Sequence, residues 1–156
     1  MNAVPCRSVR PLLAALVLAL SFAAPARAEH SKTVGGLTVY LGVVPAEVVK
    51  GHEPGHSERQ MHEGVPSRRG QYHVMVVIFE SASGKRITDA RVVARVSEPG
   101  LAPVQKQLEP MAIAGAMSFG NYFPMGSAGP YSIKVAFEPA AAKQKFETEF
   151  RYAMPR

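Results

Sequence analysis

An apolar residue at every second position is the feature that most constrains the fold of this chain. From Leu37 onward this period of two recurs along the sequence, and no window of a dozen residues keeps a clean helical period. Successive side chains of a β-strand point to opposite faces of a sheet, so the pattern is typical of strands with one face in a core and the other in water. The sequence therefore predicts an all-β fold.

Turn residues divide this alternating pattern into about seven strands at the spacing of a sandwich. Their expected ranges are 37–43, 72–79, 91–96, 104–109, 117–123, 131–137 and 146–152. The first strand is expected to kink or end at Pro45 and to continue briefly over 47–50. We predict a single immunoglobulin-like antiparallel β-sandwich. Its inward-facing residues are expected to be Val92, Ala94, Val96, Tyr131, Ile133, Val135, Phe146, Phe150 and Tyr152.

The N-terminal segment has the pattern of an export signal. Arg7 and Arg10 precede an apolar run over 12–22, and Ala26 and Ala28 supply the small residues that signal peptidase reads. We therefore expect a signal peptide over 1–28 with cleavage before Glu29, and a periplasmic location. Residues 29–36 would then form a flexible mature N-terminus, and 37–156 the sandwich.

Removal of this signal excludes several classes of protein. It removes Cys6, the only cysteine, so disulfides, thiol nucleophiles and thiolate metal sites are not expected in the mature chain. It also removes three arginines and no acidic residue, which lowers the formal net charge from +6 to +3, too little to favour nucleic acid as a partner. No later apolar run approaches the ~18 residues that a membrane-spanning helix needs. The product should be soluble and should not span a membrane.

Residue patterns typical of enzymes are scarce. Asp89 is the single aspartate and lies beside an expected turn, and the sequence has neither a Gly-x-Ser-x-Gly elbow nor a phosphate-binding glycine loop. Glu147 and Glu149 would share one face of a strand, but their alternation with Phe146 and Phe150 favours a solvated face. We therefore expect a protein without catalytic activity.

One segment departs from the strand pattern and carries the candidate metal ligands. The loop over 51–70 contains four glycines, two prolines and no periodicity, and long loops in compact domains are often functional. The loop and the strand after it contribute six candidate ligands. They are His52, His56, Met61, His62, His73 and Met75.

The chemistry of these side chains favours copper. Residues two apart on a strand share one face, so His73 and Met75 can converge on one ion. Imidazole suits copper, and thioether sulfur favours Cu(I). Glu53, Glu58 and Glu63 lie in the same loop and could serve a harder ion, which leaves iron and zinc open.

A metal-free interpretation of the same residues stays open. His73 and Met75 can simply pack on a covered face of the strand, since methionine is a common core filler. Met125, beside Pro124 and Gly126, is expected to be exposed at one end of the sandwich, and Met111 in a connecting segment as well. The alternative function is therefore a binding module that docks onto a membrane or envelope complex through the 51–70 loop and the Met125 end.

Four segments resemble a known group of exported domains. They are 72–79, the Gly-Lys turn and following strand over 84–92, the turn at 98–100, and the Gly-Pro-Tyr segment that opens 129–135. Together they resemble the YtkA-like β-sandwich domains, whose architecture is similar to that of CopC-like periplasmic copper carriers. The resemblance implies an exported β-sandwich. Our leading hypothesis is a periplasmic carrier or accessory protein for a transition metal, with copper as the preferred ion.

Overall fold

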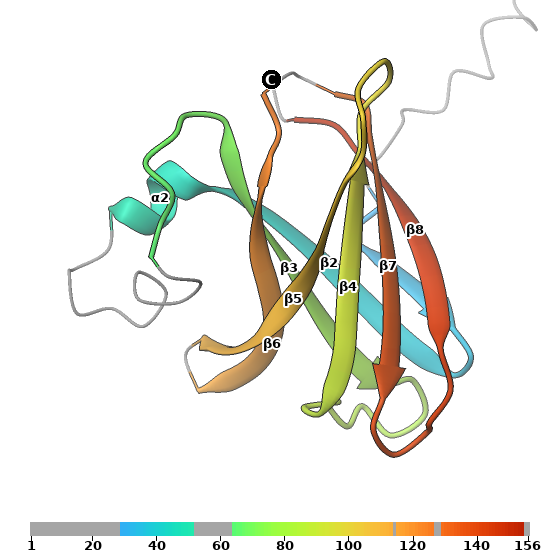
Figure 1. The fold of residues 1–156 in the computed structure, drawn as a ribbon. Helices are drawn as coiled ribbons and strands as arrows, with labels where there is room; N and C mark the ends of the chain where they lie inside the picture. The colour runs from blue at the N-terminus through green and yellow to red at the C-terminus, as the bar shows by residue number, and fades with distance from the viewer. Residues whose placement is uncertain (1–28, 52–63, 114, 127–128, 155–156) are drawn as a thin grey trace, which may run out of the picture.

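Eight strands and one short helix make up the part of the chain that the computed structural model describes, residues 29–51, 64–113, 115–126 and 129–154 (Figure 1). The predicted signal peptide lies outside these residues. The elements are β1 (Ser31–Val34), β2 (Leu37–Pro45), α2 (Ala46–Lys50), β3 (Gln71–Glu80), β4 (Ala90–Ser97), β5 (Val104–Ile113), β6 (Ala116–Pro124), β7 (Tyr131–Pro139) and β8 (Phe146–Tyr152).

The strands form one antiparallel sheet that curls until its two ends meet. Their order is β1-β2-β3-β6-β5-β4-β7-β8, with every neighbouring pair antiparallel. The first and last strands of this order lie against each other, and the Phe146 ring of β8 packs on Gly35 in the β1–β2 turn. The prediction of an all-β antiparallel fold is confirmed as a sandwich or barrel-like sheet that is nearly closed (Figure 1). An immunoglobulin-like topology is not confirmed.

Strand β5 joins the two layers of the sheet. Its first half, Val104–Leu108, pairs with β4, and its second half, Glu109–Ile113, pairs with β6. Where β5 leaves β6, side chains bridge the two strands: the Lys106 ammonium donates to the Tyr122 carbonyl at 2.7 Å, and the Asn121 amide donates to the Gln107 carbonyl at 2.9 Å. We call this place the β5–β6 seam. At this seam, side-chain donors satisfy backbone carbonyls that do not pair with a neighbouring strand.

The core lies between the two layers and contains the residues that the alternating pattern predicts. Eight of the nine residues expected to face inward are buried, and the ninth, Phe146, is partly buried and packs against them. On β3 the core residues are Val74, Val76 and Ile78, all fully buried. The opposite face of β3 therefore carries the residues at 73 and 75.

Two segments differ from the sequence predictions. Residues 29–36, expected to be a flexible N-terminus, contain β1. The predicted strand extension over 47–50 is wrong, because helix α2 lies there. Pro45 ends β2, and the buried residues Ala46 and Val49 lie three apart, which suits a helical turn. In the described part of the chain, no helix has the length and apolarity needed to cross a membrane.

Candidate metal centre

The outer face of β3 and β6, opposite the main core, holds a buried histidine. In the β3–β6 register His73 lies across from Tyr122, and Met75 lies across from Gly120. His73 and Tyr122 are only 1% and 2% exposed, although they project away from the main core. Such a side chain must be held by its neighbours, since a polar group that is buried without a partner is costly.

Tyr122 fixes the plane of this histidine. The two rings stack with centroids 4.7 Å apart and planes inclined by 26°. The backbone of Tyr122 is itself held at the β5–β6 seam, where its amide donates to the Asn121 side-chain oxygen at 2.8 Å and its carbonyl accepts from Lys106. The imidazole therefore packs against a rigid aromatic surface.

Gly120 brings a sulfur atom close to this imidazole. A Cβ placed on Gly120 would lie 2.6 Å from Sδ of Met111 and 2.7 Å from Nε2 of His73, closer than real Cβ atoms approach other atoms. The two donor atoms thus lie around one point, with β6 between the strands that supply them, β3 and β5. Only glycine leaves that space. We call Gly120, His73 and Met111 the Gly120 centre.

Met111 is fixed at its backbone as well. It lies across from Ser118 in the β5–β6 register, and the Ser118 hydroxyl donates to its carbonyl at 3.3 Å. Both residues are buried, with 3% of Met111 and 4% of Ser118 exposed. An imidazole nitrogen and a thioether sulfur held in this way are donors that suit copper.

Met75 shares the outer face with His73, but its side chain lies over β2. Its methyl carbon is 3.3 Å from the position that a Cβ of Gly42 would take, and Gly42 is its partner in the β2–β3 register. Met111, rather than Met75, has its sulfur within 3 Å of the point that His73 approaches.

The other predicted ligands, His52, His56, Met61 and His62, lie outside the described residues. Among the residues that are described, no three or more histidine, cysteine, aspartate or glutamate side chains are placed to hold a metal ion. In that part of the chain the candidate centre therefore consists of one imidazole and one thioether.

The sequence pattern did not place Met111 or Gly120 beside His73. Met111 was expected to be exposed in a connecting segment, and this is wrong because β5 extends through Ile113 and buries it. Met125 was also expected to be exposed, but it is 1% exposed and belongs to the main core. The one available signal was Gly120 within an apolar strand pattern, since such a glycine often marks a close approach of other atoms.

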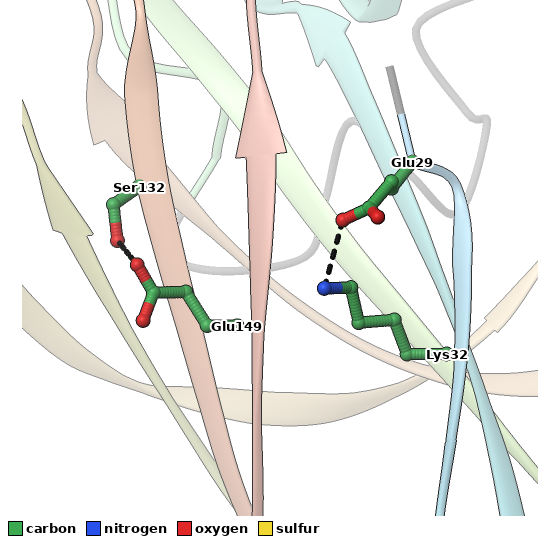
Figure 2. Close-up of polar contacts among 4 residues, drawn as sticks. All are labelled: Glu29, Lys32, Ser132 and Glu149. Carbon is green, nitrogen blue, oxygen red and sulfur yellow. Dashed lines mark hydrogen bonds and ion pairs between the residues drawn. The ribbon is translucent and has the colours of Figure 1, made fainter. Parts of the chain in front are cut away.

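The paired glutamates of β8 lie on an exposed face, as predicted. Glu149 accepts a hydrogen bond of 2.6 Å from the Ser132 hydroxyl (Figure 2). The Lys134 ammonium, on the same strand as Ser132, lies 3.7 Å from the other carboxylate oxygen of Glu149. The Ser132 hydrogen bond, helped by Lys134, holds the pKa of Glu149 below its ordinary value. The same view shows an ion pair between Glu29 and Lys32, with 2.7 Å between the charged atoms. These are surface contacts and do not form an acid–base pair.

Comparisons with known proteins relate the chain to solved structures through its fold. No family model and no curated protein matches the sequence. A copper-bound variant of FetP from uropathogenic Escherichia coli strain F11 superposes with a TM-score of 0.61 at 14% identity, over 81% of this chain and 94% of FetP. A copper-bound variant of the P19 protein from Campylobacter jejuni gives 0.64 at 11% identity, over 81% and 95%.

A third solved structure has the same fold without a named ligand. It is a DUF4426 family protein from Pseudomonas aeruginosa PAO1, with a TM-score of 0.61 at 17% identity, over 83% of this chain and 98% of that protein. At such identities the likeness concerns the fold. The resemblance to YtkA-like domains stays a prediction.

Proposed function

We propose that this protein is an exported copper-binding carrier or accessory protein of the periplasm and that His73 is its principal ligand. The observation that carries the proposal is the Gly120 centre, where a buried imidazole and a buried thioether lie around one point outside the main core. When bound, copper would supply the capacity to be passed between sites or to change oxidation state, and the protein would supply the donors.

The donor atoms fit this ion. Imidazole nitrogen and thioether sulfur are typical copper ligands. The copper-bound FetP and P19 structures give the same fold a precedent for copper, at low sequence identity. Neither precedent nor residue pattern points to catalysis, so we propose a non-enzymatic role.

The remaining candidate ligands are proposed as additions to His73. Met75 lies two residues further along the same strand and face. Met61, His62, His52 and His56 precede that strand in the 51–70 loop. In this proposal the strand supplies a fixed ligand, and the loop completes the coordination.

The test is metal analysis of protein purified from the periplasm without a histidine tag. The wild type should contain copper, and a His73→Phe variant, which keeps an aromatic ring stacked on Tyr122, should contain little. His30→Ala is the matched control, because His30 is exposed near the N-terminus of the described chain. Equal copper content in wild type and His73→Phe would contradict the proposal.

The same preparation tests export. Mass spectrometry should give a mature protein beginning at Glu29, because Ala26 and Ala28 occupy the positions read by signal peptidase. A protein that retains Met1 would argue against a periplasmic role.

The metal-free docking module is not favoured. It relied on Met125 being exposed at one end of the sandwich, and Met125 is buried. The alternative then depends on the 51–70 loop.

A further inference from the structure

We infer that the Gly120 centre selects a soft monovalent cation, Cu(I), and that Met111 is its second ligand. The inference rests on the proposed function and names the ion. It differs from the sequence hypothesis, which paired His73 with Met75.

The missing side chain at Gly120 lets both donors approach the same position, so Sδ of Met111 and Nε2 of His73 lie at most about 5.3 Å apart. The three heavy atoms nearest to a Cβ on Gly120 are Sδ of Met111, Nε2 of His73 and Cε1 of His73. Sulfur and nitrogen are therefore the atoms that line this space most closely. Metal–nitrogen and metal–sulfur bonds are about 2.0–2.3 Å long, so small side-chain adjustments would let both atoms bind one ion.

The donors favour a monovalent ion for two reasons. Thioether sulfur is soft and selects Cu(I), whereas oxygen donors suit harder divalent ions. The cost of burying an ion rises with the square of its charge, so a divalent ion would cost about four times as much as a monovalent one in the same surroundings. Neither an imidazole nor a thioether carries a negative charge that would offset this cost.

Glu109 offers a way to distinguish Cu(I) from harder divalent ions at this centre. It lies across from Gly120 in the β5–β6 register and is exposed, so the register partner of Gly120 on β5 carries a hard oxygen donor. A Cu(II) or Zn(II) ion at this place would recruit that carboxylate, because oxygen donors suit harder ions. A Cu(I) ion would not need it. Glu109→Gln therefore separates the two ion classes.

The main experiment compares two methionines that are both buried. Met111→Leu keeps the approximate volume of the side chain and removes the sulfur, and Met125→Leu makes the same change in the main core. Tag-free protein is titrated with Ag⁺, a redox-stable substitute for Cu(I), and with Cu(I) in competition with bicinchoninate. Binding is also followed by the NMR signals of the methionine methyl groups.

The expected result is specific to Met111. Met111→Leu should weaken Ag⁺ and Cu(I) binding by more than about 100-fold, since losing even an outer-shell contact costs about 10- to 100-fold. Met125→Leu and Glu109→Gln should bind as the wild type does. In the wild type, Ag⁺ should shift the methyl signal of Met111 and leave that of Met125 in place.

A second variant tests the close approach of the two donors. Gly120→Ala would place a methyl group within 2.7 Å of both donor atoms, so they would have to move, and the change should abolish Ag⁺ binding in protein that keeps its wild-type circular dichroism. Wild-type Ag⁺ affinity in folded Gly120→Ala would overturn the inference. If that variant does not fold, the Ag⁺ affinity of Met111→Leu alone tests the inference.

The outcomes also distinguish this inference from the proposed function. Copper that is lost in His73→Phe but bound equally by wild type and Met111→Leu would overturn the role of Met111 and leave the copper carrier standing. Tight Cu(II) binding that Glu109→Gln abolishes would overturn the selection of Cu(I). Failure of the wild type to bind Ag⁺, Cu(I) or Cu(II) would overturn both proposals.

Discussion

At the scale of single residues, solvent exposure separates the outer surface from the Gly120 centre. Glu149 has its carboxylate in water, and its interactions with Ser132 and Lys134 change its proton affinity more than they change the fold. His73 is buried, and its place depends on a stacked ring and on a glycine that leaves room for it. Small changes therefore matter far more at the centre than on the exposed face of β7 and β8.

The lowered pKa of Glu149 predicts a weak dependence of stability on pH. Because the folded state favours the carboxylate, its contribution is present above the ordinary pKa of 4.5 and is lost as pH falls through the lower folded value. Ser132→Ala, which removes the largest cause, should raise the pKa of Glu149 in an NMR titration of the carboxyl carbon. The loss in unfolding free energy should be larger near pH 7 than near pH 3. An unchanged pKa in the variant would contradict this assignment.

At the scale of elements, each strand obeys the period of two, so a substitution tests the register of the whole strand. Ile133 of β7 is fully buried between Val96 and Phe150 in the cross-strand register. Ile133→Ala should lower the unfolding free energy by about 2–5 kcal/mol in urea denaturation, because it leaves a cavity. Ile113→Ala, at the half-buried end of β5, is the control and should cost less. A loss below about 1 kcal/mol at Ile133 would mean that β7 has slipped by one residue.

The β5–β6 seam is the element-scale feature that supports the candidate centre. Lys106→Met keeps the aliphatic stem and removes the donor to the Tyr122 carbonyl, so it should cost about 1–3 kcal/mol of unfolding free energy. Lys85→Met, at an exposed turn, should be close to neutral. Hydrogen exchange at the amide of Tyr122 should speed up in the first variant alone. If both variants unfold at the same urea concentration, the Lys106 hydrogen bond contributes nothing to the unfolding free energy.

At the scale of the whole molecule, the nearly closed sheet would link the proposed metal binding to global stability. The Gly120 centre draws on three strands, β3, β6 and β5, that come together only in the folded chain. A ligand that binds only the folded state stabilises it by about 2.7 kcal/mol at a free concentration of 100 Kd. Ag⁺ should therefore raise the thermal midpoint of the wild type and leave that of His73→Phe unchanged. Equal shifts in both proteins would show that silver binds elsewhere.

The local pattern of the sequence was enough to predict the strands and their inward faces. Alternation is a property of neighbouring residues, so Val92, Ile133 and Phe150 could be assigned to the core without knowing which strands pair. It was also enough to single out His73 as a candidate ligand. Local patterns were weaker over short segments such as 46–50, where one helical turn and a strand end have similar composition.

Strand order and the partner of His73 were decided by the tertiary structure. Met111 and His73 are distant in sequence, and they meet because β6 inserts between β3 and β5 and carries glycine at the point of closest approach. The burial of Met111 depends on β5 leaving β4 for β6 halfway along its length. Such pairings are set by long-range contacts that compete across the whole sheet, and a period of two is the same whichever strand lies alongside.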